Sequence, residues 1–141
     1  MEERNTHQLE EELKLCPDFT KYYEENRNTM KEDALAVLLQ RLLDEKDLKR
    51  ADVIRNSNLN EVYAYQIFQG KRIPDRTKLL GLVFGMKLNF DEAQQLLKSA
   101  GYAPLYAKRS FDCIIIYSLV KGYDLMETND LLYYYGEDLI G

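Results

Sequence analysis

Residues 47–72 read DLKRADVIRNSNLNEVYAYQIFQGKR, and the most informative signals for the fold lie in this stretch. Its first half predicts a short helix over residues 49–56. Asn60 is a residue type that caps helix N-termini, and Gly70 is the type that ends helices in the left-handed conformation. A second short helix is therefore expected between Asn60 and Gly70, after a turn.

Further helices are expected on both sides of this stretch. Leucines three or four residues apart, from Leu35 to Leu43, form the apolar stripe of a preceding helix. Downstream, Pro74-Asp75 and Asn89 are helix starts, and a helical hairpin is expected after Pro104. Because no segment predicts a convincing strand, the expected fold class is all-α, with about seven helices.

Composition excludes several classes of function. The chain has 141 residues, 45% of them hydrophobic, which suffices for one globular domain. A single histidine cannot supply the usual metal-ligand sets or a Ser-His-Asp or Cys-His catalytic site. The sequence also has no glycine-rich phosphate loop. We therefore expect no enzyme, no metal and no cofactor.

The compartment expected from the sequence is the cytoplasm. The N-terminus is acidic and polar, unlike a secretory signal, and no apolar run reaches the length of a membrane span. Cys16 and Cys113 are too few for a disulfide framework, so we expect buried, reduced thiols.

The charge is unevenly distributed along the chain. Residues 46–78 carry eight Lys/Arg and four Asp/Glu, whereas residues 1–45 have a net charge of −6 and residues 79–141 a net charge of −3. A basic segment inside an acidic chain is typical of nucleic-acid contact, with a solvated charged surface as the alternative.

The spacing within residues 33–104 resembles the lambda-repressor-like, XRE-type (Cro/CI) helix-turn-helix family. Six apolar residues fall on the family's core positions without a gap: Leu48, Val53, Ile54, Leu59, Ala64 and Ile67. Ser57-Asn58 stands at the family's turn, and residues 70–74 match its closing G-K-R-x-P. Phe68 departs from the family, which usually has glutamate there, and is either a core residue or an exposed contact.

The resemblance implies a DNA-binding transcriptional regulator built on a five-helix, repressor-like bundle. Together with the helices expected outside residues 33–104, the chain is expected to comprise an acidic N-terminal helical extension (residues 1–28), a helix-turn-helix DNA-binding domain (29–104) and a C-terminal helical hairpin packed on that domain (105–141). The partner that it implies is double-stranded DNA, read by the helix at residues 60–69 in the major groove.

The expected contacts follow from which side of that helix faces outward. With Ala64 and Ile67 inward, the side chains that can reach base edges are Asn60, Glu61, Val62, Tyr65 and Gln66. Gln66 can form two hydrogen bonds with adenine. Phosphate contacts are expected from six residues that flank or end the helix: Lys49, Arg50, Gln69, Lys71, Arg72 and Arg76.

Two alternatives from other classes stay open. The same fold also serves as an antitoxin-like protein-interaction module, which an exposed Tyr63/Tyr65 pair and Glu61 would suit. A small-molecule sensor is the weaker alternative, because the C-terminal hairpin is small for a ligand pocket.

A homodimer is expected through the C-terminal hairpin. Operators usually pair two half-sites, so something must hold two copies together. The helix expected over residues 110–121 is apolar around most of its circumference and is expected to be buried on several sides. The predicted interface residues are Ile115, Tyr117, Leu119 and Tyr134. The alternative is a monomer in which the N-terminal segment covers this surface.

Overall fold

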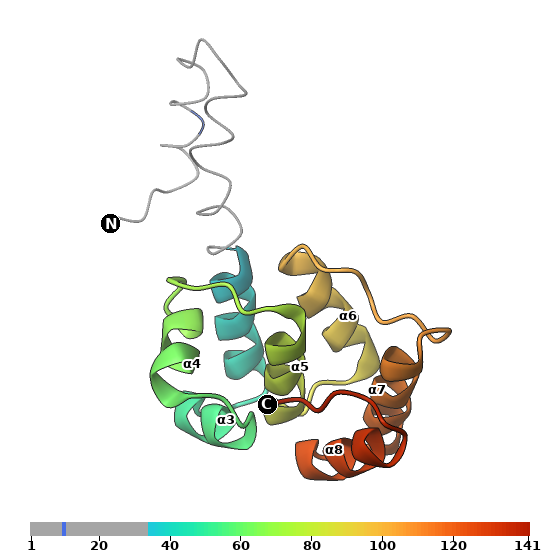
Figure 1. The fold of residues 1–141 in the computed structure, drawn as a ribbon. Helices are drawn as coiled ribbons and strands as arrows, with labels where there is room; N and C mark the ends of the chain where they lie inside the picture. The colour runs from blue at the N-terminus through green and yellow to red at the C-terminus, as the bar shows by residue number, and fades with distance from the viewer. Residues whose placement is uncertain (1–9, 11–33) are drawn as a thin grey trace. The chain divides into compact units, whose positions relative to one another are not determined.

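The computed structural model describes residues 34–141 and, before them, Glu10 alone. From residue 34 onward the chain is all-α with seven helices, and no strand lies among these residues. A first helix covers residues 34–45, and six more follow: α3 (Arg50–Asn56), α4 (Glu61–Phe68), α5 (Arg76–Gly85), α6 (Phe90–Ser99), α7 (Ser110–Lys121) and α8 (Leu125–Tyr134) (Figure 1). The expected fold class is confirmed at this level. The predictions for residues 1–28, including the thiol of Cys16, lie outside the described residues.

Local capping explains where most of these helices begin. The side chains of four N-cap residues accept a hydrogen bond from the backbone N–H three residues ahead: Asn60, Asp75, Asn89 and Asp124. In α6 and α8 the third helical residue is a glutamate that accepts the backbone N–H of the cap in return. These reciprocal bonds satisfy amides that a helix N-terminus otherwise leaves unpaired.

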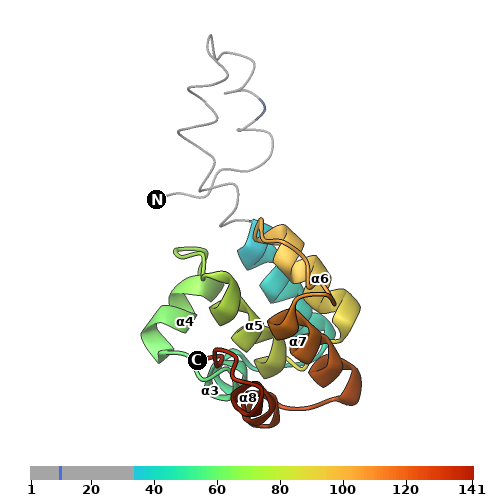
Figure 2. The same ribbon diagram turned by 45° about the vertical axis from the view of Figure 1, so that its right-hand side comes forward.

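The core is built around α5. Its side chains Leu79, Leu80, Leu82 and Val83 are fully buried, and the helix contacts α3, α6 and α8. Figures 1 and 2 show α5 passing between α3 and α4 on one side and α6 and α7 on the other. From Leu79 to Gly85 every residue of the helix is buried, which explains why this part of the segment is apolar around its whole circumference.

Two glycines allow α3 to approach α5 closely. A Cβ atom on Gly85 would overlap the Ser57 hydroxyl and lie 2.7 Å from the carbonyl oxygen of Val53, and one on Gly81 would lie 2.9 Å from the Ser57 carbonyl oxygen. Ser57 is fully buried, and its hydroxyl donates to Val53 O at 2.6 Å. The end of α3 and the start of the turn to α4 therefore pack directly against α5.

The C-terminal hairpin packs with α7 against α6 and α8 against α5. Helix α7 buries Ile114 and Ile115, whereas Tyr117 is 47% exposed and Val120 is 70% exposed. The expectation that this helix is buried on several sides is therefore wrong, because it lies at the edge of the bundle. Cys113 is exposed on the same helix, so its prediction as a buried thiol is also wrong.

The last residues of the chain fold back over the bundle. Ile140 is fully buried beside Gly81, and the Asn129 amide pairs with its backbone. Asn129 Nδ2 donates to Ile140 O, and Ile140 N donates to Asn129 Oδ1, both at 2.8 Å. Both views show the C-terminal end beside α3 (Figures 1 and 2). The segment therefore links the end of α8 to the region where α3 turns into α4.

Among residues 34–141, no helix combines the length and the apolar character needed to cross a membrane.

Candidate nucleic-acid interface

A short turn sets the position of α4 relative to α3. Ser57 ends α3, and Asn58 adopts the left-handed conformation with φ = 57°. Asparagine tolerates this conformation because its side chain can hydrogen-bond locally. Asn60 then caps α4 by accepting the Tyr63 backbone N–H at 3.1 Å. The expected turn and cap are both confirmed.

The two sides of α4 differ in character. Ala64, Ile67 and Phe68 are buried in the core, which settles the two alternatives for Phe68 in favour of packing. The predicted base-contacting residues all retain exposed surface: Asn60, Glu61 and Val62 are exposed, and Tyr65 and Gln66 are half-buried. Val62 is 67% exposed, although it is apolar. The outward side is thus a mixed surface of amides, one carboxylate and one aliphatic side chain.

Several cationic side chains lie beside α4. Lys49 and Gln69 are exposed, as are Lys71 and Arg72 in the loop after α4. Arg50 is half-buried, because its Nη2 donates to Gln40 Oε1 at 3.1 Å and its Cζ lies 5.2 Å from the ring centroid of Phe68. Four of the six predicted phosphate-contacting residues therefore lie on or beside α4, namely Arg50, Gln69, Lys71 and Arg72, and Lys49 precedes Arg50 at the start of α3.

Tyr63 organises two cations next to α4. Its ring centroid lies 4.8 Å from Lys78 Nζ and 5.9 Å from Arg72 Cζ, within the range of cation–π attraction. Partial burial, followed by the nearby Asp75 carboxylate, raises the pKa of Tyr63 above its ordinary value. Lys78 was missed from the sequence. Its position in the first turn of α5 can be read from the sequence, but no local pattern shows that it lies over the Tyr63 ring.

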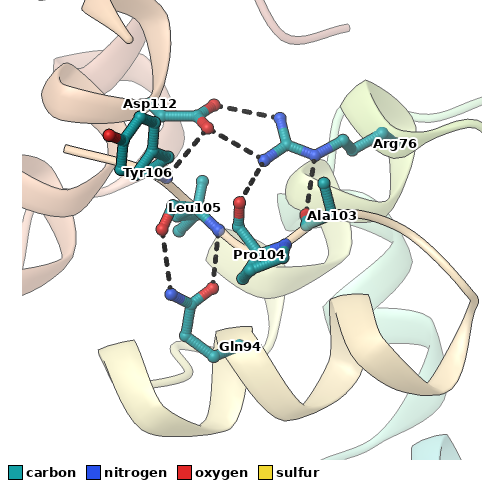
Figure 3. A network of polar contacts seen from close by, with 7 residues as sticks. All are labelled: Arg76, Gln94, Ala103, Pro104, Leu105, Tyr106 and Asp112. Atoms are coloured by element: carbon teal, nitrogen blue, oxygen red, sulfur yellow. Dashed lines mark hydrogen bonds and ion pairs between the residues drawn. The ribbon is translucent and has the colours of Figure 1, made fainter. Parts of the chain in front are cut away.

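Arg76 is engaged elsewhere in the fold. Its Nη1 and Nη2 donate to the two carboxylate oxygens of Asp112 at 2.9 and 3.0 Å, and its Nε and Nη2 donate to the carbonyl oxygens of Ala103 and Pro104 (Figure 3). Asp112 is buried and also accepts the Tyr106 backbone N–H. The prediction of a phosphate contact is therefore wrong for Arg76, because its N–H groups hold the loop between α6 and α7.

Gln94 of α6 also holds the loop between α6 and α7 (Figure 3). Gln94 Oε1 accepts the Leu105 backbone N–H at 2.7 Å, and Gln94 Nε2 donates to the Leu105 carbonyl at 3.1 Å. Together with the Arg76–Asp112 pair, it fixes the segment that leads into the C-terminal hairpin.

The predicted exposed pair of tyrosines is not present. Tyr63 and Tyr65 are both half-buried and pack against the hydrophobic core. Two residues apart in a helix, they point in different directions and cannot form one surface.

The predicted dimer residues divide between core and surface. Ile115 is fully buried, so it is not available to a second copy and is removed from the predicted interface. Leu119 is half-buried, whereas Tyr117 is 47% and Tyr134 is 79% exposed. Residues 122–141 also carry five acidic and no basic side chains. We call the exposed part of α8 and the residues after it the acidic tyrosine surface: Met126, Glu127, Asp130, Tyr133, Tyr134 and Tyr135.

An open groove of about 920 Å³ lies where the end of α3 and the α5–α6 turn meet the start of α8. Side chains of both charge signs line it, including Arg55, Lys87, Asp124 and Glu127. Such a mixed lining does not select one class of ligand. No group of three potential metal ligands occurs in the described part of the chain.

Comparisons of the chain with known protein families, characterised proteins and solved structures found no match.

Proposed function

We propose that the protein is a sequence-specific DNA-binding transcriptional regulator that places α4 in a major groove of double-stranded DNA. The observation that carries this proposal is the arrangement around α4: one side is buried in the core, and Arg72 and Lys78 lie beside residues of the partly exposed other side. The major groove of B-DNA admits one α-helix, and its base edges are read through hydrogen bonds and methyl contacts.

We assign the helix at residues 34–45 and helices α3–α6 to the five-helix, lambda-repressor-like bundle that the sequence resemblance implies. In this assignment α3 and α4 form the helix-turn-helix. The order of the helices and the left-handed Asn58 in the turn support it.

The chemistry of the outward side chains suits base and backbone contacts. The Asn60 oxygen accepts the cap hydrogen bond, so its side chain has N–H donors to offer a base or phosphate. The exposed Val62 can contact a thymine methyl group, and Glu61 can accept from the amino group of cytosine. Lys49, Lys71 and Lys78 would neutralise phosphates, with Lys78 in place of Arg76.

A salt-dependence measurement with matched variants tests the proposal. Fluorescence anisotropy with a random-sequence duplex at several salt concentrations gives the slope of log affinity against log salt. We expect Lys71→Ala and Lys78→Ala each to weaken binding and to reduce the slope by about 0.9, as for the loss of one phosphate contact. Lys98→Ala, an exposed lysine on α6, is the control and should leave the slope unchanged. Absence of binding at low ionic strength, or equal effects of all three variants, would contradict the proposal.

The acidic tyrosine surface favours a second candidate function, a protein-interaction module. Tyrosine and methionine are enriched in protein interfaces, and Tyr133 and Tyr134 are each nearly four-fifths exposed. The two functions are compatible in one chain, because this surface lies on α8 and not on α4.

A further inference from the structure

The side chain of Arg72 is held against α4 by two contacts. Arg72 Nε donates to Gln66 Oε1 at 2.6 Å, and Arg72 Cζ lies 5.9 Å from the ring centroid of Tyr63. Gln66 and Tyr63 are three residues apart in α4, so they are neighbours on the helix surface and can both contact one side chain. The guanidinium of an exposed residue is thus oriented by the helix that we propose to enter the groove.

These contacts determine which polar atoms of Arg72 and Gln66 remain available to a ligand. Arginine carries only donors, so the glutamine oxygen must face Arg72 and the glutamine NH2 group must lie at the other end of its amide. The Nε–H of Arg72 is used, and the Nη1–Nη2 edge remains for another partner. The pair therefore presents mainly hydrogen-bond donors to a ligand.

A surface of donors matches guanine better than adenine. Guanine presents two acceptors in the major groove, O6 and N7, and the arginine fork bonds both. Adenine presents one acceptor and one donor, and it pairs with a glutamine whose oxygen is available. In this structure the Gln66 oxygen already accepts from Arg72.

We propose that Arg72 reads a guanine base in the major groove, with Gln66 and Tyr63 as positioning residues; this inference rests on the proposed DNA binding. It reassigns Arg72 from phosphate to base and Gln66 from adenine contact to support of Arg72. Orientation before binding lowers the side-chain entropy lost when the two hydrogen bonds to guanine form. Neighbouring Lys71 supplies positive charge to the phosphates without the fork geometry.

Selection from a pool of randomised duplexes, followed by titration of the selected duplex and its single-base-pair variants, tests the inference. For the wild type, we expect one G·C pair whose change to A·T weakens binding about tenfold or more. Arg72→Lys keeps the charge but lacks the fork, so it should lose the preference at that pair and keep the others. Gln66→Ala should reduce the preference at the same pair. Lys71→Ala is the control and should weaken all duplexes by one factor.

Three results would overturn the inference. The first is that Arg72→Lys retains the wild-type preferences, and the second is that Arg72→Ala weakens all duplexes equally, as loss of a phosphate contact does. The third is that Gln66→Ala changes the preference at an A·T pair that Arg72→Lys leaves intact. Each of these leaves DNA binding itself in place, whereas a wild-type protein that binds no duplex contradicts the proposed function. All four substitutions are outside the buried core, and matching thermal unfolding curves would show that the variants fold.

Discussion

Arg76 and Asp112 show how a single pair links distant parts of the chain. The carboxylate of Asp112 is 2% exposed and the guanidinium side chain of Arg76 is 23% exposed. An aspartate buried this far is stable in its charged form only with such a partner, because desolvation of an unpaired charge is costly. The pair also orders the loop that leads to α7.

We expect Arg76→Ala to lower the free energy of unfolding by about 3 kcal/mol, because it leaves Asp112 buried without its counter-ion. Urea denaturation monitored by circular dichroism measures this change. Lys98→Ala, which removes an exposed cation on α6, is the control and should change stability by less than about 0.5 kcal/mol. Equal stability of the wild type and Arg76→Ala would mean that the pair contributes nothing to the fold.

Glu92 gives stability that depends on pH. Its carboxylate accepts the Asn89 backbone N–H and lies 3.0 Å from Lys46 Nζ. Partial burial alone raises the pKa of Glu92, but the bond from Asn89 and the Lys46 ammonium together outweigh it and lower the pKa below 4.5. A carboxylate with a lowered pKa stabilises the fold above its unfolded pKa, and this contribution is lost as pH falls through the folded pKa.

Glu92→Gln should therefore be less stable than the wild type at neutral pH, by less than about 1 kcal/mol because the ion pair is partly exposed. The difference should close in acid, where the wild-type carboxyl group is also neutral. Urea denaturation of both proteins at a series of pH values from neutral into acid follows this difference. A difference that persists in acid would assign the effect to the shape of the side chain and not to its charge.

Helix α5 packs closely against α3 at Gly85. Replacing Gly85 by alanine tests this contact. In an exposed helix, Gly→Ala stabilises by up to about 1 kcal/mol. At Gly85 the added Cβ would lie 2.7 Å from a backbone oxygen of α3, so we expect destabilisation of about 1–3 kcal/mol through overpacking. Chemical denaturation gives the sign directly. Any gain in stability would contradict the packing of α3 on α5 described above.

The starts and ends of the helices could be predicted from sequence because capping is local. Asn60, Asp75 and Asn89 accept backbone N–H groups only three residues away, so the pattern that predicts the cap lies within one turn. Tertiary partners lack such a local pattern. Arg76 and Asp112 are 36 residues apart, and nothing next to Arg76 in the chain distinguishes an arginine that meets a buried carboxylate from one that faces solvent.

Within the candidate site, too, features set by the local sequence could be predicted, and features set by packing between helices could not. Helical periodicity correctly predicted that Ala64 and Ile67 face the core and that Asn60, Glu61 and Val62 are exposed, but it placed Tyr65 outward although its ring packs partly against the core. The place of Lys78 over the Tyr63 ring depends on how α5 crosses α4, and periodicity within one helix does not contain that information. The burial of Ile115 depends in the same way on which side of α7 meets α6 and α8.

For the whole molecule, a homodimer through Tyr117, Leu119 and Tyr134 stays a prediction. Residues 122–141 of each copy contain five acidic and no basic residues. The two contacting surfaces would therefore repel each other at low salt. We expect association that strengthens as salt rises and weakens in Tyr134→Ala, measured by light scattering. A monomer at low and high salt would contradict the prediction and leave the acidic tyrosine surface to a different partner.

Whether α4 binds DNA is tested best by nuclear magnetic resonance of the isotope-labelled full chain, titrated with a short duplex at low ionic strength. The account predicts that chemical-shift changes concentrate on the backbone amides of residues 60–72, on Lys78 and on the start of α3, and that they disappear as salt is added. Amides of α8 should shift little. Spectra that do not change with duplex, or changes centred on α8 instead of α4, would contradict it.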